Sequence, residues 1–171
     1  MNKSLNLSLL AALTIASATA NAQQNSPART GGLSVPANKI VGLWDTQPSV
    51  GPCGSAPPAA VGHTTLLFNA GGTWIENPRF PPDGVLVNGS VQKRSGGLGI
   101  WSYNPLTARY TAHMQFDWYA DGVYSGYQTV DRTIQLSGDG KLAAGPVRST
   151  RHAADGSVLM ELCGSAVGNR L

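Results

Sequence analysis

Residues Val123–Leu136 read VYSGYQTVDRTIQL, in which Val130 and Ile134 share one parity with the final leucine. Alternation with a period of two is typical of a β-strand that turns one face to the core. The same parity holds Gln128 and Arg132, so we expect this strand to point an amide and a guanidinium into the interior. A buried guanidinium is costly unless it meets an acid, carbonyl groups or a ligand.

The preceding segment, residues 108–119, alternates in the same way, and Ala120-Asp121-Gly122 joins the two segments as a hairpin. Its even positions hold the large apolar side chains, so we expect that face to lie inside. The inward residues are then Tyr110, Met114, Phe116 and Trp118. The odd positions include His113, which we expect on the solvent side.

Short β-segments separated by turn residues occupy the rest of the chain. They comprise residues 40–44, 63–68, 73–76, 98–103, 141–152 and 157–163. Residues 77–97 are rich in proline and glycine, which predicts a long loop or a loop that hides a strand around residues 85–91. About eight antiparallel strands in sequential order predict an all-β, up-and-down barrel, since closure removes exposed edges; a β-sandwich is the alternative.

The N-terminus has the pattern of a secretory signal peptide. Lys3 precedes an apolar stretch over residues 5–18, and the small-residue triplet Ala20-Asn21-Ala22 follows. We expect cleavage after Ala22 and export to the bacterial periplasm or beyond it. Residues 23–38 would then be a flexible lead-in and residues 39–171 a single barrel domain. The rest of the sequence has no second apolar stretch long enough to predict a membrane anchor.

The chain has two cysteines, Cys53 and Cys163. In an oxidising compartment an even pair most often forms a disulfide. The three histidines, His63, His113 and His152, lie on different predicted strands without metal-ligand spacing, and the sequence has no P-loop or dinucleotide motif. We therefore expect neither a metal nor a cofactor. The net charge of +3 comes from scattered residues, which does not predict nucleic-acid binding.

Gly42-Leu43-Trp44 resembles the G-x-W signature of lipocalins and of the wider calycin barrels. The resemblance implies a calycin-like barrel in which Trp44 plugs the closed end and Arg170 packs over it. A wider set of residues is similar to a family of small exported bacterial proteins with no assigned activity, which implies the barrel and transfers no function. This set comprises Phe68, Ala70-Gly71-Gly72-Thr73, Glu76, Gly99, Trp101, Asp121-Gly122, Gly126-Tyr127-Gln128, Val130, Arg132, Leu136, Asp139-Gly140, Cys163 and Arg170.

The sequence leaves three alternative partners for the inward guanidinium of Arg132. Trp74 and Glu76 share a face of their strand, so a core tryptophan would bring the carboxylate inside to pair with Arg132. Alternatively, Arg132 stacks on Trp44, a place for which Arg170 competes. The third interpretation is functional: the arginine receives the carboxylate or phenolate of a ligand.

An apolar interior with sparse polar groups is typical of a ligand pocket. The first hypothesis is a protein that binds a small apolar or amphipathic molecule, aromatic and carboxylate-bearing ones included, in the barrel cavity. The expected binding residues are Arg132, Gln128, Tyr124, Tyr110, Trp101, Met114, Phe116 and Trp118.

The alternative is a cofactor-independent lyase, isomerase or cyclase that works in the same cavity. Glu76 would be the base, while Arg132 and Tyr110 would stabilise an oxyanion. A Glu76–Arg132 pair would weaken that base by favouring its charged form, so binding is the preferred hypothesis. A filled barrel without a ligand and a structural role in the cell envelope are further alternatives.

Overall fold

The computed structural model describes residues 36–56 and 62–171, so the expected signal peptide lies outside the described residues. Within this part of the chain, a short 3₁₀ helix, η2 (Pro36–Ile40), precedes ten strands. No helix in it is long and apolar enough to cross a membrane. The strands are β1 (Gly42–Pro52), β2 (Thr64–Phe68), β3 (Thr73–Pro78), β4 (Val85–Val87), β5 (Ser90–Arg94), β6 (Gly97–Asn104), β7 (Arg109–Ala120), β8 (Val123–Leu136), β9 (Leu142–Ala153) and β10 (Val158–Arg170).

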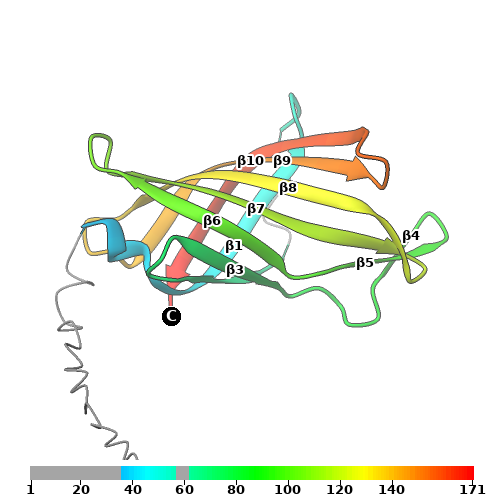
Figure 1. Cartoon of the computed structure of the whole chain (residues 1–171), viewed down its shortest axis with the longest axis horizontal. Coiled ribbons are helices and arrows are strands. Elements are labelled where there is room, and N and C mark those ends of the chain that lie inside the picture. The colour runs from blue at the N-terminus through cyan, green and yellow to red at the C-terminus, as the bar shows by residue number, and fades with distance from the viewer. Residues whose placement is uncertain (1–35, 57–61) are drawn as a thin grey trace, which may run out of the picture.

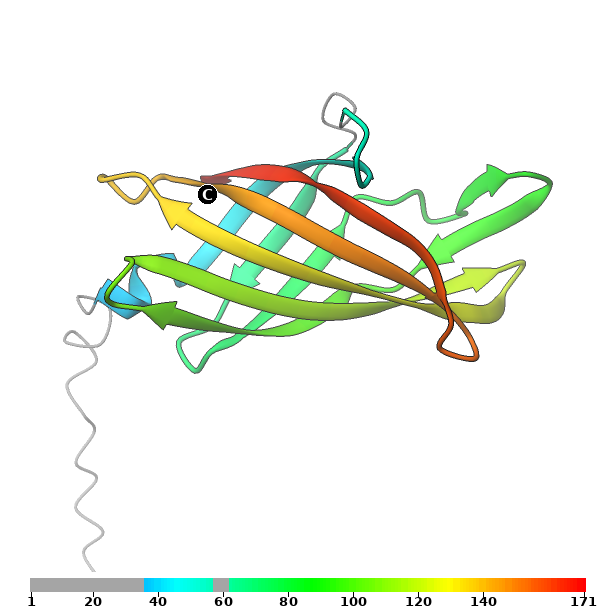
Figure 2. The same ribbon diagram turned by 90° about the horizontal axis from the view of Figure 1, so that it is seen from above.

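Eight of these strands form a closed antiparallel up-and-down barrel, which confirms the predicted fold class. The order around the barrel is β1-β2-β3-β6-β7-β8-β9-β10, and β10 pairs with β1 to close it. Figures 1 and 2 show these strands wrapped around one interior, with the β4–β5 hairpin extending beyond one end. Closure gives every strand an inner and an outer face, so residue parity determines burial.

The strands that close the barrel, β1 and β10, run further than the sequence predicts. They pair with each other from Trp44–Arg170 to Pro52–Leu162, whereas the pairing of β1 with β2 ends at Thr46. Pro48 and Pro52 therefore lie where β1 has a single neighbour, a position that tolerates the missing N–H of proline.

The long irregular stretch predicted over residues 77–97 contains the hairpin of β4 and β5. β5 and β6 pair with successive parts of β7. Arg94 of β5 pairs with Trp118, and Leu98 of β6 pairs with Gln115. This register brings side chains of β5 to the end of the barrel opposite η2.

One end of the barrel is closed by η2 and by Trp44. The Trp44 indole donates to the carbonyl of Ile40 at 2.8 Å, and the guanidinium of Arg170 lies 4.5 Å from the Trp44 ring centroid. Arg170 also donates to the carbonyls of Lys39, Val41 and Gly140. Arg170, rather than Arg132, therefore occupies the place over Trp44.

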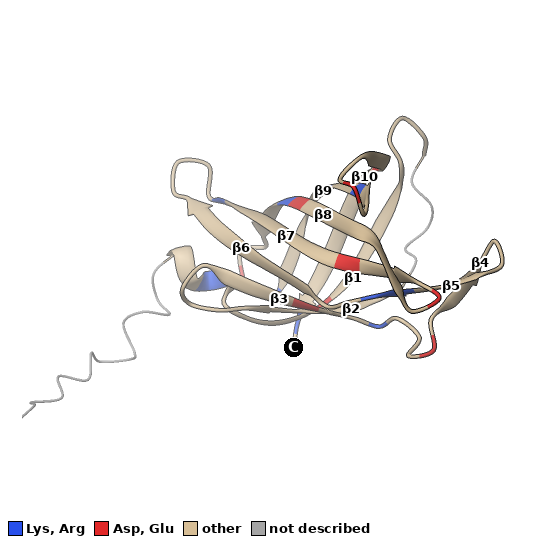
Figure 3. Ribbon diagram, turned by 45° about the vertical axis from the view of Figure 1, so that its right-hand side comes forward, with Lys and Arg blue, Asp and Glu red and all other residues tan. Residues whose placement is uncertain are grey.

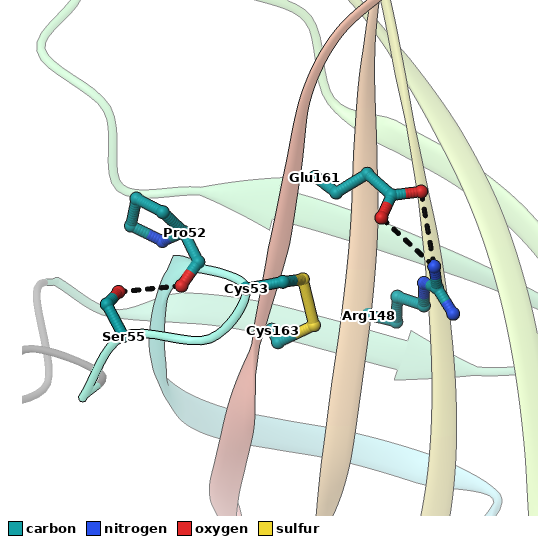
Figure 4. The surroundings of a disulfide bond; sticks show 6 residues. All are labelled: Pro52, Cys53, Ser55, Arg148, Glu161 and Cys163. Atoms are coloured by element: carbon teal, nitrogen blue, oxygen red, sulfur yellow. Dashed lines mark hydrogen bonds and ion pairs between the residues drawn. A yellow bond between two sulfur atoms is a disulfide. The ribbon is translucent and has the colours of Figure 1, made fainter.

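A disulfide joins Cys53 and Cys163, as the sequence predicts, with 4.8 Å between their Cα atoms. Cys53 follows β1 directly and Cys163 lies in β10, so the bond lies beside the pairing that closes the barrel (Figure 4). The two cysteines are 110 residues apart in the sequence. A covalent loop of this length restricts the unfolded chain strongly.

Replacing both cysteines, Cys53→Ser with Cys163→Ser, should lower the free energy of unfolding by up to about 4–5 kcal/mol, because the unfolded chain regains the loop entropy. Urea denaturation of the oxidised protein and the double variant measures the difference. The reduced wild-type protein is the matched control and should behave like the variant. Equal stability of all three would contradict this role.

Candidate functional site

The interior of the barrel is apolar with a small set of polar side chains. The buried apolar residues fill the closed end and the walls, led by Trp44, Trp74, Tyr110 and Ile134. Charged residues are sparse along the strands, as Figure 3 shows. The buried polar side chains are Thr46, Thr64, Glu76, Gln128, Arg132 and Ser149, all of inward parity on β1, β2, β3, β8 and β9.

A cavity of about 110 Å³ lies among these polar residues. Its apolar wall includes Leu66, Met114, Phe116, Val130 and Val147. Its polar wall is formed by Thr46, Thr64, Glu76, Arg94, Gln128, Arg132 and Ser149. Apolar walls with a few convergent polar groups are the usual composition of a small-molecule site.

The carboxylate of Glu76 is bound on both of its oxygens. Arg94 forms a salt bridge with one oxygen, and the hydroxyl of Thr64 donates to the other at 2.9 Å. The Glu76 and Arg94 side chains are only 6% and 14% exposed, and the guanidinium also lies over the Phe116 ring at 3.4 Å. Burial lowers the pKa of Arg94, and the nearby Glu76 charge partly offsets this effect.

Of the three interpretations of Arg132, a direct salt bridge with Glu76 is not formed, because Arg94 takes the carboxylate; Glu76 acts on Arg132 only through its nearby charge. The sequence analysis did not identify Arg94 as a partner, since this residue falls in the stretch expected to be irregular. Only the register of β5 against β7, which pairs Arg94 with Trp118, brings the residue to the barrel end. If the strand predicted around residues 85–91 had been extended to Arg94, it would have indicated that this residue can reach Glu76.

Arg132 faces the cavity without a direct partner. The side chain is 8% exposed, and its Nε atom is buried with no hydrogen bond. Among the described residues, no side chain or carbonyl forms a hydrogen bond or salt bridge with this guanidinium. Burial lowers the pKa of Arg132 to about 10, an effect that the charge of Glu76 opposes, so the group is still cationic at neutral pH.

Gln128 connects the cavity to the end of the barrel opposite η2, which is the open end. Its side-chain oxygen accepts from the Trp118 indole at 2.9 Å, and its amide donates to the Ser149 hydroxyl at 2.7 Å. Ser149 in turn donates to the Thr129 carbonyl at 2.7 Å. The amide is thus held in one orientation, and it holds the Trp118 side chain at the end of the cavity.

The structure brings only part of the predicted binding set together. Arg132, Gln128, Met114 and Phe116 line the cavity. Trp118 borders it through the bond to Gln128.

Two predicted residues lie toward the closed end instead. The Tyr110 hydroxyl donates to the carbonyl of Pro36 at 2.6 Å, and the Trp101 indole donates to the carbonyls of Asn69 and Thr73. Tyr110 and Trp101 pack against each other there, and neither lines the cavity.

Tyr124 departs from the expected inward orientation. Its side chain is 44% exposed and packs edge-on against Tyr119. A register shift between Trp118 and Tyr119 places a β-bulge in this part of the β7–β8 ladder. A bulge reverses the parity of the residues beyond it, so alternation counted from the core does not hold there.

His113 lies on the outer wall, as its parity predicts, with its Nδ1 atom 2.8 Å from an oxygen of Asp131. A wider hollow of about 580 Å³ lies against this wall. Its lining includes His113, Asp131 and Arg148, together with Trp101 and Arg132 of the predicted binding set. Arg148 forms its own ion pair with Glu161. The polar side chains of this wall are paired with one another and are about half exposed or more, so water weakens their interactions. The barrel interior is therefore the better candidate site.

Within residues 36–56 and 62–171, no group of three or more His, Cys, Asp or Glu side chains is placed to hold a metal ion.

The fold and the site together describe a closed eight-stranded antiparallel β-barrel with a mostly apolar cavity that contains a few polar groups, compatible with a calycin-like fold. No protein-family model, curated protein or solved structure matches this chain.

Replacing Arg94 by Met should lower the free energy of unfolding by about 3–5 kcal/mol, since it leaves the Glu76 carboxylate buried without its ion-pair partner. Urea denaturation measures the change. The matched control is the double variant Arg94→Met with Glu76→Gln, which removes the orphaned charge and should regain most of the loss. A double variant no more stable than the single one would show that the ion pair is not the cause.

Proposed function

We propose that this chain is an exported protein that binds a small amphipathic anion, a molecule with a carboxylate and an apolar body, inside its barrel. The observation that carries the proposal is the unpartnered guanidinium of Arg132 in the cavity wall. A carboxylate offers this group the charge-assisted hydrogen bonds that the protein itself does not provide.

The cost of holding Arg132 in this position supports a functional reason for it. Burial lowers the pKa of Arg132 to about 10, which means that the folded protein disfavours the charged form of this side chain. An apolar side chain of similar volume would fill the same space without that penalty. Charges kept at such a cost are frequent at binding sites, where stability is exchanged for function.

The size of the cavity limits what part of the ligand it holds. A volume of about 110 Å³ is smaller than the roughly 150 Å³ of an engineered apolar cavity that binds benzene. The cavity therefore suits an acidic head and a short apolar segment. Leu66, Met114 and Val130 line it for the apolar segment, and a longer body would extend toward the open end.

A reaction with Glu76 as the base is the weaker proposal. Both of its oxygens already accept bonds, from Thr64 and Arg94, so a substrate would have to share or displace these bonds to reach the carboxylate. The hydroxyl of Tyr110 donates to the Pro36 carbonyl at the closed end, away from the cavity.

Export, and a likeness to small exported bacterial proteins, are part of the same proposal. The disulfide between Cys53 and Cys163 is the structural feature that supports it, because such bonds persist in oxidising compartments. The signal-peptide pattern before Ala22 is the supporting feature of the sequence.

Replacing Arg132 by Met should weaken the binding of hexanoate and benzoate by about 10-fold to 150-fold, the loss expected for charge-assisted hydrogen bonds of roughly 1.5–3 kcal/mol. The same change should raise the melting temperature, because it removes a buried charge. Titration calorimetry and thermal denaturation measure the two effects. Recovery of the acid unchanged by mass spectrometry separates binding from catalysis.

The matched control is Arg148→Met, the same replacement on the outer wall, where the side chain is 63% exposed. It should leave the affinity for both acids unchanged. Affinity that survives Arg132→Met while the melting temperature falls would show that Arg132 is structural, and would refute the proposed site.

A further inference from the structure

A second inward guanidinium lies near the open end of the barrel. Arg151 of β9 pairs in register with Gln128 of β8, and its guanidinium stacks on the Trp118 ring at 4.2 Å. Its Nε atom is buried without a hydrogen bond, and the contact of its Nη2 atom with the Ser125 hydroxyl is long, at 3.5 Å. Burial lowers the pKa of Arg151 from its usual value.

The charges inside the described barrel do not balance. Glu76 neutralises Arg94, and none of the salt bridges among the described residues includes Arg132 or Arg151. Two guanidinium groups therefore remain without a carboxylate. Each has a buried Nε atom that lacks an acceptor, so each can donate a hydrogen bond to an anionic group.

The two groups lie at different levels of the barrel. Arg132 is paired with Val147, and Arg151 follows four positions later on β9. A rise of 3.2–3.4 Å per residue separates these levels by about 13 Å along the strand. Gln128 and Ser149, which are hydrogen-bonded to each other, lie at positions between them. The two arginines therefore enter the barrel from backbone positions well apart along the strands, which favours an elongated ligand over one compact acidic group.

We propose that Arg151 forms a second anion subsite, and that the ligand is an elongated dianion with an acidic group at each end, such as an α,ω-dicarboxylate. One carboxylate binds Arg132 in the cavity, and the other binds Arg151 at the mouth. The apolar body between them lies against Phe116 and Trp118, which pack together with ring centroids 5.9 Å apart. This inference depends on the proposed binding at Arg132.

The test compares octanedioate with octanoate, two acids of equal chain length that differ in the second carboxylate. Titration calorimetry on the wild-type protein should show that octanedioate binds about 10-fold more tightly, as expected for one additional charge-assisted contact. In Arg151→Met, the ratio of the two affinities should fall to about one. Arg151→Lys keeps the positive charge and should retain part of the preference.

Arg132→Met should weaken the binding of both acids, whereas the outer-wall control Arg148→Met should leave both affinities unchanged. Equal binding of the two acids by the wild-type protein would overturn the second subsite and leave the proposed function intact. A preference for octanedioate that persists in Arg151→Met would also overturn the second subsite and leave the proposed function intact. If neither acid binds the wild-type protein, or if Arg132→Met binds both as well as the wild-type protein does, the proposed function fails as well.

Discussion

The pairing of β1 with β10 is the constraint on which the rest of this structure depends. It joins residues from Trp44 to Pro52 with residues from Arg170 to Leu162 and converts a meander of hairpins into a closed wall. Once the wall is closed, each strand residue faces either solvent or an enclosed interior, with no edge between the two. Thr46 of β1 and Ala166 of β10 thereby become buried, and the polar side chains of inward parity share a single space.

Within that space, the low polarity of the surroundings strengthens the hydrogen bonds and ion pairs that polar groups form. It also raises the free-energy cost of a polar group that has no partner. The Glu76–Arg94 pair shows the first effect, since both charges have partners and contribute to the order of the open end. The guanidinium groups of Arg132 and Arg151 show the second, because each has a buried nitrogen without an acceptor. A barrel with uneven internal charge is less stable than an apolar one, and its positive charge inside is the basis of the anion binding that we propose.

Much of this arrangement could be predicted from alternation alone, because one parity rule determines the inner face of a regular strand. The rule correctly placed Arg132 and Glu76 inside. It did not identify the partner of Glu76, since Arg94 reaches the carboxylate through the register of β5 on β7, which no local pattern encodes. It misplaced Tyr124, which lies beyond a β-bulge. Arg151 shares the parity of the buried residues of β9, so a full parity count of that segment would have indicated it.

The position of the disulfide has a consequence for how the chain reaches its native state. The first and last strands are the most distant in sequence, so their contact forms late and slowly in a chain that folds by local hairpins. Until it forms, both strands are open edges that neighbouring chains can extend into aggregates. A covalent bond at Cys53 and Cys163 turns this most distant contact into a nearly local one. Oxidation before folding would therefore shorten the time during which the chain is vulnerable to self-association.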